Sequence, residues 1–281
     1  PLQRRIVRNA ELPSTVRQKD PTCVVMLEET EPKACVFGVS SSARTVVLFG
    51  DSHADHWSTP LIDIAKENGF RLVTFMKSSC RATRMTSYSD KLRRKFTECD
   101  EWRERAIRLI LAMKPQMVII SQFSIGNLEG EIADPAQIPA RKRQWAEGLR
   151  STIGEFSKAG IETVYLRDVP THRAFIDKCV ARALWQRRSP SVCDTPREVA
   201  LDDADAATER RIISGIAKAR YVDLSNLFCG EKFCHAMIGG MIAFRDRHHL
   251  ATPFAASLAG PLGRAIFETK NSVADAGAAN P

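Results

Sequence analysis

The sequence lacks a long hydrophobic run. Its continuous apolar stretches, such as residues 46–49 and 117–120, fall far short of the ~20 residues that a helix needs to cross a bilayer. We therefore expect no membrane span within these 281 residues. The composition also shows no bias toward disorder, collagen or a coiled coil, because hydrophobic residues make up 44% of the chain and charged residues 26%.

Other signals are missing as well. There is no internal repeat, no C-x-x-C pair of the kind found in zinc ribbons and thioredoxins, and no hydrophobic core of a signal peptide. Since the chain starts at Pro1 without Met, we expect a processed or excised piece of a longer protein. Basic residues outnumber acidic ones by 41 to 33, and the net charge of +8 favours an anionic surface, a lipid head group or an acidic polymer as neighbour.

Eight cysteines are present, and they fall into four near pairs along the chain. Nearest-neighbour pairing closes four short loops, so we expect these disulfides: Cys23 with Cys35, Cys80 with Cys99, Cys179 with Cys193, and Cys229 with Cys234. A disulfide set of this size indicates an oxidising compartment. Free buried thiols are the alternative.

Strand-like and helix-like patterns alternate from residue 45 onward. The five expected strands cover residues 45–49, 71–76, 117–120, 163–166 and 221–224. Helical stripes follow them, around residues 57–65, 102–113, 145–156, 212–216 and 254–266. Parallel neighbours need crossover connections, so the alternation predicts an α/β fold, a three-layer α/β/α domain with a five-stranded, mostly parallel sheet.

The chain is expected to have three parts. Residues 1–40 are rich in proline, begin with basic residues and show little periodicity, which predicts a lead-in linker. Residues 41–270 form the predicted domain. The Ala-rich and polar residues 271–281 are expected to be a disordered tail.

The turn after the first strand carries Gly50-Asp51-Ser52-His53. In open α/β sheets, ligands bind at the carboxyl ends of the strands. A serine on this turn exposes its hydroxyl, and its backbone N–H at the head of a helix suits an oxyanion. The alternative is a plain helix cap made by Asp51 or Ser52.

Asp246 and His249 lie three residues apart, just before the last predicted helix. This spacing lets the carboxylate reach Nδ1 of the imidazole while Nε2 points away toward a serine. A serine becomes a good nucleophile when a histidine takes its proton, and a carboxylate orients that histidine. A pair of surface histidines beside a salt bridge is the alternative, and the presence of both motifs in one chain favours catalysis.

These motifs resemble those of a known family. Gly50-Asp51-Ser52-His53-Ala54 resembles block one of the SGNH (GDSL) hydrolases, and Asp246-x-x-His249-Leu250 resembles their final block. The second and fourth cysteine pairs and the turn Asp168-Val169-Pro170 look like a narrower subgroup, the extracytoplasmic SGNH domains fused to membrane-bound acyltransferase-3 proteins. Members of this subgroup O-acetylate bacterial surface polysaccharides. The resemblance covers about residues 40 to 268.

The resemblance implies a flavodoxin-like SGNH hydrolase fold with Ser52 as nucleophile, His249 as general base and then acid, and Asp246 as the orienting carboxylate. The middle family blocks are not matched cleanly. We expect the Ser52 N–H as one oxyanion donor, with Ser79 or Gln122 as additions, while Gly126-Asn127 follows further along. A missing donor costs on the order of 3–4 kcal/mol, so an incomplete oxyanion hole implies a slow enzyme or one that relies on its partner domain.

Other polar residues receive plainer interpretations. His53 and His56 are expected to pack or cap near the helix start, and His248 to face solvent. A zinc site would need Cys234, which pairs with Cys229 in the expected disulfide set, so we expect no metal; its candidate ligands are Cys234, His235, Asp246 and His248. The basic run from Arg81 to Lys95 is typical of a solvated helix face, and its place near the site also suits an anionic glycan.

The expected activity is therefore acetyl transfer to hydroxyls of a bacterial surface polysaccharide through an acyl-serine. A carbohydrate acetylesterase, in which water replaces the sugar hydroxyl, and a non-catalytic glycan-binding module are the alternatives. The implied partners are a glycan acceptor, an acetyl donor and a membrane-spanning acyltransferase domain upstream in the same chain. That domain would tether this one to the inner membrane, on the periplasmic side. We expect no cofactor and no nucleic acid.

Overall fold

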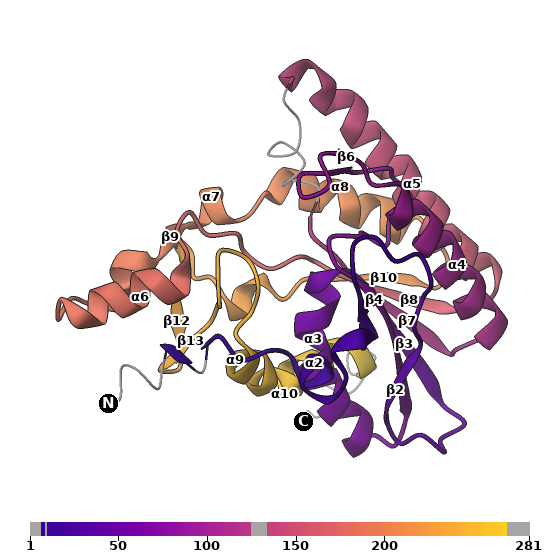
Figure 1. Ribbon diagram of the computed structural model, residues 1–281, viewed down its shortest axis with the longest axis horizontal. Helices are drawn as coiled ribbons and strands as arrows, with labels where there is room; N and C mark the ends of the chain where they lie inside the picture. Colours follow the sequence, from indigo (N-terminus) through magenta and orange to yellow (C-terminus); the bar gives the residue numbers. More distant parts are fainter. Residues whose placement is uncertain (1–6, 9, 125–133, 269–281) are drawn as a thin grey trace, which may run out of the picture.

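The structure, a computed structural model, describes residues 7–8, 10–124 and 134–268. Its centre is a sheet with helices on both faces (Figure 1). Five parallel strands make up most of the sheet: β3 (Thr45–Gly50), β4 (Arg71–Lys77), β7 (Met117–Ser121), β8 (Glu162–Leu166) and β10 (Ala219–Val222). Their spatial order β4-β3-β7-β8-β10 is the flavodoxin-like order 2-1-3-4-5. The predicted α/β class with a mostly parallel sheet is confirmed.

Two further strands extend the sheet to seven. β2 (Cys35–Gly38) pairs antiparallel with the first half of β4, and β1 (Val24–Val25) pairs parallel with its end. The predicted number of five strands is therefore wrong, because strands of two and four residues are too short to show a period. The disulfide Cys23–Cys35 links the residue directly before β1 to the first residue of β2. The described part of the predicted lead-in linker is thus packed into the domain.

Alternate residues of the central strands pack into two separate cores. Val46 and Leu48 face α3 (Ser52–Glu67), α9 (Thr252–Ser257) and α10 (Ala259–Phe267). Val47 and Phe49 face α4 (Thr97–Met113), α5 (Ile138–Lys158) and α8 (Asp203–Ser214). This alternation is what a strand buried on both faces requires.

Short helices and strands make up the rest of the described structure. α6 (Ile176–Trp185) projects from the body beside β9 (Thr195–Pro196) and the hairpin of β12 (Met237–Ile238) and β13 (Met241–Ile242) (Figure 1). The remaining elements are α2 (Thr15–Lys19), η1 (Pro21–Cys23), β5 (Tyr88–Ser89), β6 (Arg94–Lys95), η3 (Pro135–Gln137), η4 (Pro190–Cys193), α7 (Arg197–Ala200), η5 (Ser225–Leu227) and β11 (Phe233–Cys234).

All eight cysteines are paired, and the four disulfides have the predicted nearest-neighbour pattern. Among the described residues, no helix combines the length and the apolar character that crossing a membrane requires. The predicted tail, residues 271–281, lies outside the described residues.

Candidate active site

The turn from β3 into α3 exposes the side chain of Ser52. Asp51 is the N-cap: one carboxylate oxygen accepts the His53 backbone N–H at 2.8 Å, and the other accepts the Phe123 N–H at 3.0 Å. Ser52 is the first helical residue, so its own N–H is among the donors that lack an intrahelical acceptor. The helix-cap alternative is thus correct for Asp51, and it leaves the Ser52 hydroxyl free for other contacts.

Gly50 is required where β3 ends. A Cβ at this position would lie 1.8 Å from the carbonyl oxygen of Ser121 on the neighbouring strand β7. Only glycine allows the two backbones to approach so closely. This contact sets the position of the turn that carries Ser52.

His249 and Asp246 reach Ser52 from the loop before α9. The Nε2 atom of His249 lies 2.8 Å from Ser52 Oγ, and its Nδ1 atom lies 2.7 Å from Asp246 Oδ2. The other oxygen of Asp246 accepts the backbone N–H groups of His248 and His249 at 2.9 and 2.8 Å. The structure therefore brings the three predicted residues into one hydrogen-bonded line.

Asp246 is ionised in this line. Burial alone would raise the pKa of its carboxyl group, but the hydrogen bond from the His249 ring and the two backbone N–H groups outweigh burial and hold the pKa below its ordinary value. A carboxylate in this state accepts the Nδ1–H of His249, which leaves Nε2 free to accept the Ser52 hydroxyl proton.

A second His–Asp pair lies beside the first, and the sequence analysis missed it. The Nδ1 atom of His53 lies 2.5 Å from Asp168 Oδ1, and its Nε2 atom lies 3.0 Å from His248 Nδ1. His248 was expected to face solvent, but it is only partly exposed, and its Nδ1 edge is turned toward His53. The only sequence signal for this pair was the Asp168-Val169-Pro170 turn after a strand.

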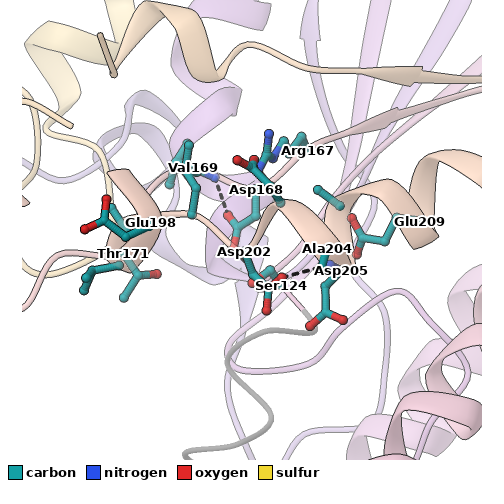
Figure 2. A pocket seen from close by; sticks show the side chains of 15 residues that line it. Ser124, Arg167, Asp168, Val169, Thr171, Glu198, Asp202, Ala204, Asp205 and Glu209 are labelled. Atoms are coloured by element: carbon teal, nitrogen blue, oxygen red, sulfur yellow. Dashed lines mark hydrogen bonds and ion pairs between the residues drawn. The ribbon is translucent and has the colours of Figure 1, made fainter. Parts of the chain in front are cut away.

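Burial controls the electrostatics of this second pair. It lowers the pKa of His53 and of His248 to about 3 each, and raises the pKa of Asp168 to about 7. Asp168 also lines a pocket of about 530 Å³ whose wall carries further carboxylates (Figure 2). These carboxylates include Glu198, Asp202, Asp205 and Glu209.

The two additional oxyanion candidates have different surroundings. Ser79 is exposed and lies just after β4, with a left-handed φ of 58°. Gln122 is fully buried, and its amide nitrogen donates to Thr83 Oγ1 and Tyr165 Oη while its oxygen accepts the Thr83 N–H. The side-chain amide of Gln122 is therefore occupied by Thr83 and Tyr165. Gly126 and Asn127 lie outside the described residues.

The basic run after β4 is a loop with a short hairpin, not the predicted helix face. Arg81 is buried and donates to the Phe123 carbonyl at 3.0 Å. Arg84 is held between Glu104 and Glu155. Part of the run lines a cavity of about 1100 Å³. Its lining includes Arg84, Tyr88, Lys95, Arg141 and Gln144.

Three histidines in the site bring metal-ligating nitrogens close together. Nitrogens of His53, His248 and His249 lie within 4.8 Å of one another, but these rings are engaged with each other and with Asp168, Asp246 and Ser52. The zinc alternative that used Cys234 is wrong, since this cysteine is bonded to Cys229. His235 instead contacts Asp194 at 2.9 Å.

The chain is similar to known proteins in sequence pattern and in fold. The family model described as "SGNH domain (fused to AT3 domains)" matches residues 19–263. The periplasmic domain of a lipopolysaccharide acetyltransferase from Salmonella ser. Paratyphi A has a similar fold, with a TM-score of 0.60, 16% identity, and coverage of 80% of this chain and 84% of that chain. Among curated proteins, none matches the chain at a significant level.

Two other solved structures are more distant. A GDSL-like lipase from Bacteroides thetaiotaomicron has a TM-score of 0.45 and 15% identity, covering 79% of this chain and 88% of that chain. A catalytic mutant of an acetylxylan esterase from Geobacillus stearothermophilus has a TM-score of 0.46 and 14% identity, covering 80% and 95%.

Proposed function

The chain belongs to the family of SGNH domains fused to AT3 domains, and from this premise we propose that it transfers acetyl groups to hydroxyls of a bacterial surface polysaccharide through an acyl-enzyme on Ser52. The observation that carries the proposal is the hydrogen-bonded line from Ser52 through His249 to Asp246. This line also argues against a non-catalytic glycan-binding module, which would not need an oriented base.

The proposed reaction has two halves. In the first, Ser52 Oγ attacks the acetyl carbonyl of the donor while His249 Nε2 takes the hydroxyl proton and then gives it to the leaving group. In the second, a sugar hydroxyl loses its proton to His249 Nε2 and attacks the acetyl group, and the proton returns to Ser52 Oγ. Asp246 stabilises the imidazolium in both halves. We propose that the Ser52 N–H and Ser79 donate hydrogen bonds to the oxyanion.

The acceptor must compete with water, which is far more concentrated. A sugar hydroxyl reacts faster than water only if the domain holds the sugar in line with the acyl-enzyme, because oriented groups reach effective molarities of ~10⁵ M or more. The cavity lined by Arg84, Tyr88 and Lys95 is our candidate for part of the acceptor site, because it combines an exposed aromatic ring with basic and amide groups.

We infer the location from the same observations. The four disulfides fit an oxidising, extracytoplasmic compartment. We propose that an AT3 domain upstream supplies the acetyl group and tethers this domain to the periplasmic face of the inner membrane. The Salmonella relative of similar fold is itself a periplasmic acetyltransferase domain, which supports this assignment.

The test is to mix the domain with an activated acetyl donor and candidate oligosaccharides, with and without the AT3 domain, and to follow acetylated sugar and free acetate by mass spectrometry. We expect acetylated sugar that is absent with Ser52→Ala. If the rate of donor hydrolysis is the same with every acceptor and with or without the AT3 domain, the protein is an esterase instead. A domain that neither hydrolyses the donor nor acylates Ser52 would support the glycan-binding alternative.

A further inference from the structure

The second His–Asp pair ends at the candidate active site. Asp168 binds His53, His53 binds His248, and the ring centroid of His248 lies 4.2 Å from that of His249. The catalytic line through Asp246, His249 and Ser52 does not use these three residues. Their arrangement therefore needs an explanation of its own.

The proton positions along this chain of groups follow from the hydrogen bonds once Asp168 is ionised. Both oxygens of Asp168 accept backbone N–H groups, from Val169 at 2.8 Å and Ser124 at 2.7 Å, and above its pKa of about 7 the carboxylate can only accept. His53 then donates its Nδ1–H to Asp168, which leaves its Nε2 as an acceptor. His248 donates its Nδ1–H to that nitrogen, so its own Nε2 carries a lone pair.

The Nε2 atom of His248 points away from the buried His53 ring. Nδ1 and Nε2 lie on largely opposite edges of the ring, and Nδ1 points to His53, which is fully buried. His248 itself is partly exposed. Among the described residues, none forms a hydrogen bond with its Nε2 atom. His249 and His248 thus both have an unprotonated Nε2 atom. That of His249 faces Ser52, and that of His248 faces away from His53.

We propose that His248 accepts a hydrogen bond from the second hydroxyl of a vicinal diol on the acceptor sugar, while His249 takes the proton of the hydroxyl that attacks. This inference rests on the proposed transfer to a sugar. The two ring centroids lie 4.2 Å apart, so two neighbouring oxygens of one sugar can each reach one of the rings through a hydrogen bond of ordinary length. The acceptor would accordingly carry a free hydroxyl next to the one that becomes acetylated.

His248 forms or breaks no covalent bond in this scheme. The attacking oxygen gives its proton to His249 and bonds to the acetyl carbon, and the Ser52 ester bond breaks as His249 returns the proton to Oγ. The second hydroxyl keeps its proton and shares it with His248 Nε2. His248 is therefore a positioning residue, and His53 and Asp168 hold it in the required tautomer.

The test compares acetyl transfer to a sugar with a vicinal diol and to the same sugar without the second hydroxyl, in the wild type and in variants of His248. The probes are methyl glycosides of glucose, galactose and mannose, each with its monodeoxy analogues, and the donor is p-nitrophenyl acetate. We expect the wild type to prefer the diol over the analogue that lacks the neighbouring hydroxyl by about tenfold in kcat/KM, the range of one neutral hydrogen bond. The preference should appear mainly in the acceptor KM.

Two variants separate positioning from packing. His248→Asn keeps an amide where Nδ1 meets His53 and has no atom at the place of Nε2, so the diol preference should disappear. His248→Gln keeps an acceptor near the place of Nε2, so this variant should retain part of the diol preference. A merely structural role would lower transfer to the diol and to its analogue equally and leave their ratio unchanged, which would overturn the proposal.

Nitrogen NMR provides a readout that needs no acceptor. At pH 8, ¹⁵N-labelled protein should show His53 and His248 as neutral rings protonated at Nδ1. A proton on His248 Nε2 would overturn the proposal. If the wild type hydrolyses the donor and acetylates none of the glycosides, with or without its AT3 domain, the proposed transfer fails and the diol site fails with it. Equal rates of acetyl transfer to the diol and to its analogue would contradict the diol site and leave the proposed acetyl transfer intact.

Discussion

His249 Nε2 lies 2.8 Å from Ser52 Oγ, although 197 residues separate the two along the chain. The parallel sheet explains this proximity. Ser52 starts α3 directly after β3, and His249 lies in the loop that precedes α9, a helix packed in the same core as α3. Both residues therefore reach the carboxyl edge of the sheet, where α/β proteins bind their ligands.

Because one proton path joins them, Ser52 and His249 should act as a unit. We expect Ser52→Ala and His249→Ala each to lower kcat for hydrolysis of p-nitrophenyl acetate on the order of 10⁶-fold at most, down to the level left by the oxyanion donors. The double variant should lose little more than either single one. Steady-state kinetics on all three variants decides this, and losses that multiply would show that the residues do not share a mechanism.

Asp246→Asn tests the tautomer of His249. The remaining side-chain oxygen of the introduced asparagine would keep the two backbone N–H groups, while its amide nitrogen would face His249 Nδ1 and act as a donor. Nε2 would then carry the proton and could not accept one from Ser52. We expect kcat to fall on the order of 10⁴-fold with the melting temperature nearly unchanged. A loss below tenfold would remove Asp246 from the mechanism.

The sequence predicted the features that have a local or motif signature. β3 and β7 contain continuous apolar runs, the cysteine pairs showed short spacings, and the two SGNH-like motifs located Ser52, Asp246 and His249. The pair formed by His53 and Asp168 had no such signature, because 115 residues separate its members and only the folded sheet brings them together. The sequence did not predict β1 and β2, because their pairing with β4 depends on a distant edge and not on their own pattern.

Charged residues were also misread for a physical reason. A run of arginines and lysines has the same composition on a solvated helix and in a loop whose guanidinium groups bind carbonyls and carboxylates. Arg81 is buried against Phe123 and Trp145, with its guanidinium carbon 5.6 and 5.9 Å from their ring centroids. Which arginine is exposed depends on the partners that the fold supplies.

Gly50→Ala tests the close approach of β3 and β7. The added Cβ would lie 1.8 Å from the Ser121 carbonyl oxygen, and neither backbone can shift without disturbing the sheet and the Ser52 turn. We expect a loss of stability above the ~1 kcal/mol average of point substitutions and a strong loss of activity. Gly154→Ala in α5 is the matched control, since nothing lies within 4 Å of its Cβ position, and it should stabilise by about 0.5–1 kcal/mol. Chemical denaturation measures both effects, and equal stabilities for the two variants would contradict the expectation.

Glu209→Gln tests the buried carboxyl group in the pocket of Figure 2. Burial raises the pKa of Glu209 from 4.5 to about 8, although the hydrogen bond from Tyr165 at 2.9 Å acts in the opposite direction. The native state therefore keeps a proton between these pH values that the unfolded chain releases. The resulting stability is fully present below pH 4.5 and is lost as the pH rises toward 8, by up to about 1.4 kcal/mol per pH unit.

The glutamine side chain of this variant would stay neutral at every pH and could still accept the Tyr165 hydroxyl. The stability of Glu209→Gln relative to the wild type should therefore increase steadily from pH 5 to pH 8, when free energies of unfolding are measured by urea denaturation at each pH. Other titrating groups are common to both proteins, so they cancel in the difference. Glu198→Gln removes an exposed carboxylate from the same pocket and shows whether the loss of any negative charge there produces the slope. A constant difference between Glu209→Gln and the wild type would mean that Glu209 is ionised in the native state across this range.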